Sequence, residues 1–253
     1  MPVDLRDGVA VLTIDRPAQR NSLSPAVMGE LIDALAALRS DDAVRAVVLT
    51  GAGEKAFCAG GDLASLAGDG PYAGHLARRQ YLELLEALLD LGKPAVAAVN
   101  GAALGGGFGL ALACDLAVAV ETATFGTPEV KVGLFPMMVT ALLVRHVGPK
   151  RAMELALTGE RISADRALEL GLVNRVVAAH VVDAARELAQ SVATLSPAVL
   201  RLGREAVYTA ADMEYRQSLR YLHAMLSLNA SLDDATEGVS AFLAKRPPLF
   251  KGR

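Results

Sequence analysis

Hydrophobic residues fall into two kinds of pattern along the first part of the chain. Almost wholly apolar runs, typical of strands that are covered on both sides, occur at residues 9–14, 46–50 and 95–99. Between the first two runs, apolar residues recur at helical spacing. They follow Ser24-Pro25, an N-cap and a first-turn proline, and share one face: Val27, Leu31, Leu35 and Leu38.

The rest of the chain carries mostly helical patterns. A helix is predicted over residues 76–91, and after Pro136 the only further strand is predicted at residues 172–176. From Ser196 onward the pattern predicts helices alone. Alternating strands and helices followed by a helical tail predict an α/β core over residues 1–195 and a C-terminal helical region over residues 196–253.

Composition narrows the class of protein. The chain has 253 residues, 53% of them hydrophobic and 21% charged, so it can bury a substantial core. A net charge of −3 gives no general attraction to nucleic acid. The first residues lack the apolar centre of a secretory signal, and the longest apolar run, residues 110–120, is too short to cross a membrane. We therefore expect a cytoplasmic protein that binds neither nucleic acid nor membranes.

Metal and disulfide chemistry are not indicated. Two cysteines in a chain of this length do not form a disulfide framework, and the four histidines share no metal-ligand spacing. Cys58 is interpreted as a small buried hydrophobe. We expect neither a metal site nor a permanently bound cofactor.

Three consecutive glycines, Gly105 to Gly107, stand where the third strand leads into an apolar helix that ends before Asp115. The first N–H groups of a helix lack internal partners and lie at the positive end of its dipole. The triplet therefore predicts a site for a ligand oxygen that carries or develops negative charge. Tight helix–sheet packing is an equally good explanation of the glycines alone. A dinucleotide fingerprint does not fit, because leucines stand where its last glycine is needed.

Several motifs, in order and at their spacings, give the chain a family resemblance. It resembles the crotonase superfamily, the enoyl-CoA hydratase/isomerase family, over nearly its whole length. The matching segments are residues 16–17, 21–23, 57–63, 100–115, 125–129, 157–159, 167–173 and 237–242. The resemblance implies a spiral of ββα units with a C-terminal helical region, a trimer or a dimer of trimers, and a coenzyme A thioester as substrate.

The resemblance also implies which residues form the acyl-CoA site. The thioester oxygen would lie between the backbone N–H groups of Gly61 and Gly106. The adenine would lie near Ala59, in the loop that continues through Asp62 and Leu63. A neighbouring subunit would help to hold the nucleotide with its Phe242 and Lys245.

Only one of the two expected catalytic carboxylates is present in this chain. Hydratases of this family use two glutamates, and the position of the first, three residues after Gly106, is Gly109 here. The second is Glu129, in its expected place after Pro128. Where many hydratases have a glycine-rich turn, this chain has Pro136-Met137-Met138. These methionines indicate a drier, more apolar wall of the acyl pocket, although they could equally fill the core.

Moving a double bond from the 3- to the 2-position needs a single carboxylate that takes a proton from C2 and returns it to C4. Hydration needs a base to orient water and an acid as well. Glu129 as the only matching carboxylate therefore predicts an enoyl-CoA isomerase. Alternatives are an enoyl-CoA hydratase, a thioesterase or decarboxylase of the same superfamily, and a crotonase-fold protein that binds acyl-CoA without turning it over.

Overall fold

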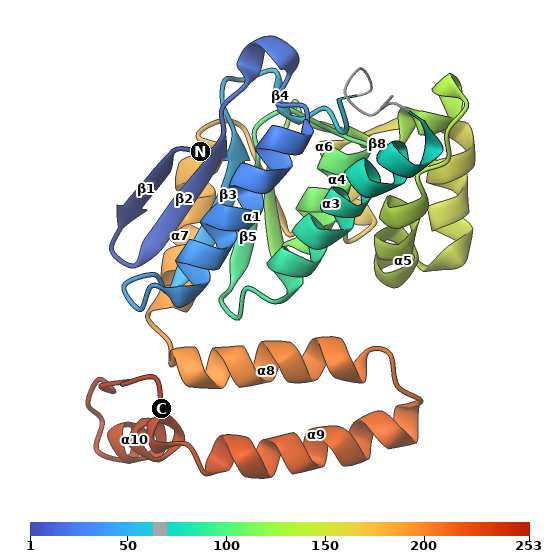
Figure 1. Cartoon of the computed structure of the whole chain (residues 1–253). Coiled ribbons are helices and arrows are strands. Elements are labelled where there is room, and N and C mark those ends of the chain that lie inside the picture. The colour runs from blue at the N-terminus through green and yellow to red at the C-terminus, as the bar shows by residue number, and fades with distance from the viewer. Residues whose placement is uncertain (63–69) are drawn as a thin grey trace.

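A computed structural model describes residues 1–62 and 70–253, and its larger sheet forms the centre of the molecule (Figure 1). The strand order is β1-β2-β3-β5-β7-β10, and all neighbours are parallel except the β1–β2 pair. The bounds are β1 Val3–Arg6, β2 Val9–Ile14, β3 Ala46–Gly51, β5 Ala95–Val99, β7 Leu116–Val120 and β10 Arg175–Val177.

A smaller sheet has the order β4-β6-β8-β9 and is built from three-residue strands. These are β4 Ala56–Cys58, β6 Ala102–Leu104, β8 Thr124–Gly126 and β9 Arg161–Ser163. Three times in succession the chain adds a strand to the larger sheet and the next strand to the smaller one: β3 then β4, β5 then β6, and β7 then β8. The structure therefore contains the repeating units of the predicted spiral, although no tandem repeat is visible in the sequence.

Helices cover both faces of the larger sheet, as the apolar strand sequences predict (Figure 1). The helices are η1 Pro17–Gln19, α1 Pro25–Ser40, α3 Pro71–Leu89, α4 Gly106–Ala113, η2 Pro128–Val132, α5 Met137–Thr158, α6 Ala164–Glu169, α7 Val181–Ala193, α8 Pro197–Ala210, α9 Tyr215–Ala230 and α10 Asp233–Leu243. Along β2, Val9 and Val11 pack on the side of α7, whereas Leu12 and Ile14 pack in the cluster that contains α1, α3 and α4.

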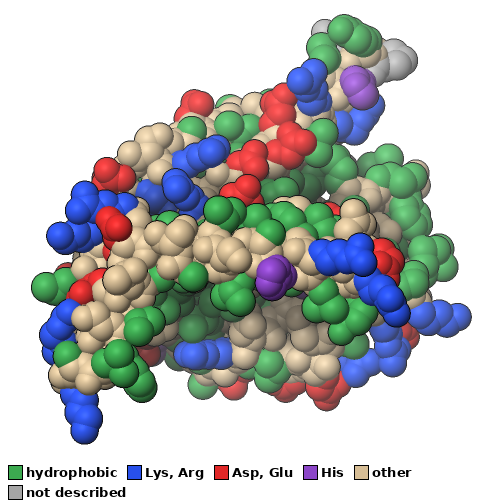
Figure 2. Space-filling view, turned by 90° about the horizontal axis from the view of Figure 1, so that it is seen from below, with side chains coloured by type: hydrophobic (Ala, Val, Ile, Leu, Met, Phe, Trp, Pro, Cys, Tyr) green, Lys and Arg blue, Asp and Glu red, His purple; other side chains and the backbone are tan. Residues whose placement is uncertain are grey.

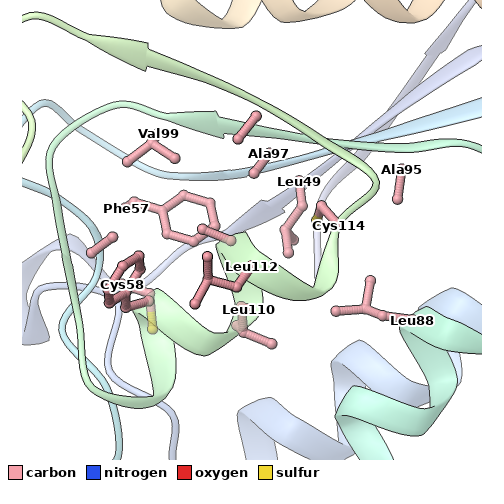
Figure 3. Packing of buried hydrophobic residues seen from close by; sticks show 14 of the residues in the cluster. Leu49, Phe57, Cys58, Leu88, Ala95, Ala97, Val99, Leu110, Leu112 and Cys114 are labelled. Carbon is pink, nitrogen blue, oxygen red and sulfur yellow. The ribbon is translucent and has the colours of Figure 1, made fainter. Parts of the chain in front are cut away.

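Helix α4 lies inside this main cluster. Its side chains Leu110 and Leu112 pack among residues of β3, β4 and β5 (Figure 3). The approach of α4 to β4 is very close, because a Cβ atom on Gly107 would overlap the carbonyl of Cys58. This contact requires glycine at position 107, so the tight-packing explanation holds for that member of the triplet.

Three predictions of the elements are corrected by the structure, and the first concerns the region after Pro136, where β9 Arg161–Ser163 is a strand that was not predicted. Helix α3 begins at Pro71 rather than at residue 76, because proline fits the first turn of a helix. The strand predicted at residues 172–176 begins only at Arg175. Leu172 and Val173 are buried in the core from the preceding turn, and Asn174 exchanges two hydrogen bonds with Ala117 of β7.

The three C-terminal helices lie below the core in Figure 1, and a partly buried ion pair holds α8 to the core. Arg204 donates to Asp115 over 2.7 Å and also to the carbonyls of Leu88 and Leu89 at the end of α3. The other carboxylate oxygen of Asp115 accepts the N–H of Ala95 at 2.8 Å. One charge pair thus links α8, α3 and the start of β5.

Candidate active site

Two glycine-bearing segments meet at the start of α4: the loop after β4, which carries Gly60 and Gly61, and the triplet that begins at Gly105. Hydrogen bonds hold the loop to the chain before α1. Leu23 donates its N–H to the carbonyl of Gly60 over 2.8 Å, and Asp62 donates its N–H to the carbonyl of Leu23 over 3.0 Å. A Cβ atom on Gly60 would lie 3.3 Å from the nitrogen of Gly106. The loop that carries Gly61 therefore abuts the first residue of α4.

Both candidate donors are available to a ligand. Within the part of the chain that the structure describes, neither the N–H of Gly61 nor that of Gly106 donates a hydrogen bond. Gly106 is the first residue of α4, so its N–H has no intrahelical acceptor and lies at the positive end of the helix dipole. Two such N–H groups on adjacent segments can bind one oxygen on which negative charge develops.

Glu129 lies against the same helix start. Its short helix η2 begins with Pro128 and is tied to α5 by the hydroxyl of Thr127, which donates to the carbonyl of Leu155 over 3.0 Å. Gly105 has a φ of 51°, a conformation that favours glycine, and any Cβ there would lie 2.5 Å from Glu129 Oε1. Gly105 therefore leaves room for the carboxyl group of Glu129 at the start of α4.

The carboxyl group of Glu129 is in an unusual electrostatic environment. Its Oε2 atom is buried and has no hydrogen-bond partner among the described residues. Burial raises the pKa of Glu129 above its usual value of 4.5, and its own backbone N–H partly offsets this effect. A carboxyl group with a raised pKa can both accept and return a proton near neutral pH.

This environment predicts that Glu129→Gln stabilises the folded protein at neutral pH. Because the folded-state pKa is raised, ionisation costs stability once the pH exceeds about 4.5, and the cost is complete above the folded-state pKa. Glutamine has the same size and carries no charge, so the substitution removes this ionisation cost. Since Glu129 is only half-buried, solvent screens the charge, and we expect a Tm increase of at most about 2–4 °C at pH 7.5, the change that ~1 kcal/mol gives in a chain of this size.

The Tm difference should vanish as the pH falls below 4.5, which differential scanning calorimetry can follow. The exposed Glu121→Gln is the matched control and should show no such pH-dependent gain. A Glu129→Gln variant that is less stable than the wild type at pH 7.5 would contradict the interpretation that the ionised carboxylate of Glu129 destabilises the folded protein.

The position of the absent first carboxylate is filled. Gly109 lies on the buried side of α4, and a Cβ atom on it would overlap the hydroxyl of Tyr81 from α3 and lie 3.2 Å from Val139 Cγ2. Sequence reasoning missed Tyr81, whose only signal was an aromatic residue on the apolar face of a predicted helix. It treated Gly109 as an empty place, which the structure corrects.

The residues expected to line the acyl pocket differ in how deeply they are buried. Pro136 is buried, and Met138 is half-buried and packs against the main core cluster. Met137 is 72% exposed in the single chain. Val139, the next residue, is 3% exposed, and its Cγ2 would lie 3.2 Å from a Cβ atom on Gly109.

The expected coenzyme A contacts are divided between two regions of the chain. Ala59 is half-buried beside the oxygen site, and Asp62 forms an ion pair with Arg16 at 3.8 Å. Leu63 lies outside the described residues. Phe242, which is 83% exposed, and Lys245 lie at the end of α10, below the core in Figure 1. A single chain does not bring them to Ala59, so only another subunit could.

Cys58 is not a nucleophile in this environment. Its thiol is buried, and burial raises its pKa to about 12, so the reactive thiolate is absent at neutral pH.

Across residues 1–62 and 70–253, no group of three or more histidine, cysteine or acidic side chains could hold a metal ion. No helix in the same ranges is long and apolar enough to cross a membrane.

Comparison with known proteins gives the same assignment as the motifs. Residues 4–253 match the family model described as enoyl-CoA hydratase/isomerase. The chain is 38% identical to (E)-benzylidenesuccinyl-CoA hydratase of Thauera aromatica over 100% of both chains. It is 38% identical to 2,3-dehydroadipyl-CoA hydratase of Escherichia coli, over 99% of this chain and 98% of that protein.

A crystal structure of an enoyl-CoA hydratase from Bacillus anthracis superposes with a TM-score of 0.95 at 38% identity, covering 100% of this chain and 99% of that one. The predicted crotonase-like α/β fold is therefore confirmed, with its parallel sheets and C-terminal helices. The chain belongs to the enoyl-CoA hydratase/isomerase family of the crotonase superfamily, whose members are enzymes that act on acyl-CoA thioesters.

Proposed function

We propose that the protein is an enoyl-CoA isomerase that converts a 3-enoyl-CoA into a 2-enoyl-CoA. One observation carries the proposal: the carboxyl group of Glu129 lies against Gly105 at the start of α4, while the position of a second carboxylate, Gly109, is filled by the Tyr81 hydroxyl. A site with one carboxylate is sufficient for a proton shuttle. Coenzyme A enters as part of the substrate.

In the proposed reaction, Glu129 removes a proton from C2 of the substrate. The electrons of that C–H bond pass towards the thioester oxygen, which becomes negatively charged and is bound by the N–H groups of Gly61 and Gly106. As the charge returns, the double bond moves from C3–C4 to C2–C3 and C4 takes the proton from Glu129. No atom is added or lost, and Glu129 ends in its starting state.

The environment of Glu129 supports this role. A base that must remove a weakly acidic proton and then return it works best when its pKa is near the working pH. Burial moves the pKa of Glu129 upward, and its Oε2 atom has no hydrogen-bond partner among the described residues that would compete for the proton. Apolar neighbours such as Val139 exclude the water that would compete for the proton.

The test is a comparison of substrates with wild-type protein. A panel of 3-enoyl-CoA and 2-enoyl-CoA thioesters of different chain lengths should show faster isomerisation of the former than hydration of the latter. Absorbance of the conjugated thioester and mass analysis of the products distinguish the two reactions. Rapid hydration of 2-enoyl-CoA with slow isomerisation would refute the isomerase assignment.

A hydratase is the second candidate, and the names of the relatives favour it. The Thauera aromatica and Escherichia coli proteins are both named as hydratases. With a single carboxylate, Glu129 would have to serve as both base and acid.

A proton-exchange experiment distinguishes an enzyme from a protein that binds acyl-CoA without catalysis. A working Glu129 should introduce deuterium at C2 of a saturated acyl-CoA in D₂O, whereas a binding protein should not.

We also propose that the protein is a trimer or a dimer of trimers, assembled through residues 196–253. No residue of α9, all of which the structure describes, is buried. Apolar side chains such as Leu226, Val239 and Leu243 are more than half exposed. Figure 2, which views the molecule from below, shows hydrophobic side chains on this surface. Apolar surface of this kind marks an interface.

Light scattering at micromolar concentration should give the mass of three or six chains of 26.4 kDa. Such an assembly could bring Phe242 and Lys245 of one subunit to the nucleotide end of another subunit's site. A stable monomer would contradict both the assembly and the shared coenzyme A site.

A further inference from the structure

The place beside Gly109 is occupied by a rigidly held side chain. Tyr81 is only 8% exposed and belongs to the main core cluster. Its hydroxyl lies where a Cβ atom of residue 109 would be, and Val139 closes the same space from α5. The absence of the first carboxylate is therefore not an empty site, because any side chain at position 109 would have to displace Tyr81.

The Tyr81 hydroxyl is fixed by a hydrogen bond to the first residue of α4. It donates to the carbonyl of Gly106 over 2.8 Å. Its ring also covers Gly106, since a Cβ atom there would lie 3.3 Å from Tyr81 Cε2. Tyr81 therefore contacts the residue whose N–H is one of the two candidate donors and stands on the side of α4 from which a second carboxylate would act.

The chemistry of this hydroxyl differs from that of a carboxylate. Burial is the largest cause that raises the pKa of Tyr81 well above 10, and the neighbouring ionisable groups Cys58 and Glu129 add to the effect. The hydroxyl is therefore protonated at neutral pH, and its hydrogen is already donated to Gly106. It cannot take a proton from water, which is the task that a base at position 109 would perform.

We propose that Tyr81 is a specificity-determining residue: by filling the place of the first carboxylate with a neutral, fixed hydroxyl, it keeps an activated water out of the site and leaves Glu129 as the sole proton acceptor. The inference rests on the proposed isomerase function and adds a residue of α3 to it. It makes the choice between isomerisation and hydration depend on the pair Tyr81–Gly109 rather than on Gly109 alone.

The geometry is tested by a double-mutant cycle in Tm, which needs no substrate. Alanine is normally better than glycine inside a helix. Gly109→Ala should nevertheless lower Tm by several degrees in the wild type, because its Cβ meets the Tyr81 hydroxyl. In the Tyr81→Phe background the same change should cost less than half as much. An equal loss in both backgrounds would overturn the proposal.

Specificity is tested by the ratio of 2-enoyl-CoA hydration to 3-enoyl-CoA isomerisation. Gly109→Glu alone should gain no hydration, since the place is filled. Tyr81→Leu combined with Gly109→Glu should raise the ratio by about 10² or more, because each general acid–base role contributes roughly 10²–10⁴. A ratio equal to that of the wild type, or a Tyr81→Phe variant that loses only hydration, would show that Tyr81 does not exclude water.

The control is Leu84→Ala, which removes a side chain of the same helix that is 1% exposed. It should lower Tm but leave the ratio of the two activities unchanged, as expected for a purely structural residue. The two proposals fail separately: the ratio of the wild type tests the isomerase, whereas the change in ratio between variants tests Tyr81.

Discussion

Glu129→Gln should lower kcat for isomerisation by at least about 10²–10⁴, the usual contribution of a general base. The change preserves the size of the side chain and removes its ability to accept a proton. The loss could exceed this range, since proton transfer is the whole of the proposed reaction. Steady-state kinetics with a 3-enoyl-CoA measures it.

Binding of a saturated acyl-CoA should survive the same substitution, because neither backbone donor is altered. Isothermal calorimetry should therefore give a similar affinity for both proteins. Glu121→Gln, in the exposed turn after β7, is the matched control and should retain full activity. Wild-type turnover by Glu129→Gln would remove Glu129 from the mechanism altogether.

Gly106→Pro should lower kcat/KM by about 10²–10³, the usual effect of losing one oxyanion donor. Proline deletes the backbone N–H without adding a charge. Gly106 is the first residue of α4, where proline is tolerated because that N–H has no helical partner. Circular dichroism should therefore show a folded protein.

Gly106→Ala separates the donor from the shape of the residue. It adds a Cβ atom, 3.3 Å from Tyr81 Cε2, but keeps the N–H group. Most of the activity should remain, with a small cost for the shift of the Tyr81 ring. If the alanine and proline variants lose activity equally while both stay folded, the N–H of Gly106 is not a donor to the substrate.

The elements that could be predicted from sequence were those with enough residues to show a pattern. The six-residue strands β2 and β3 and the helix α1 were found near their observed bounds. The strands of the smaller sheet have three residues each, too few for any periodicity, and β4 lies in a segment interpreted as a loop. Their pairing comes from tertiary contacts, such as β4 with β6, that no local sequence contains.

The candidate site also contains residues that the sequence could predict and one that it could not. Gly106 and Glu129 were chosen from motifs, and the structure places both at the start of α4, against Gly105. Their roles in catalysis remain predictions. Tyr81 could not be found, because its relation to Gly109 exists only where α3 crosses α4. A glycine in a sequence indicates the absence of a side chain, but it does not tell which neighbour fills the space.

The partly buried pair of Arg204 and Asp115 makes the docking of α8 depend on parts of the chain that precede it. Every group that accepts a hydrogen bond from the Arg204 side chain, namely Asp115 and the carbonyls of Leu88 and Leu89, comes earlier in the chain. The larger sheet and the candidate site residues Gly61, Gly106 and Glu129 likewise come before residue 204 in the chain. Helix α8 can therefore dock only onto chain that is already made, and the helices α8, α9 and α10 are the last part of the fold to be put in place.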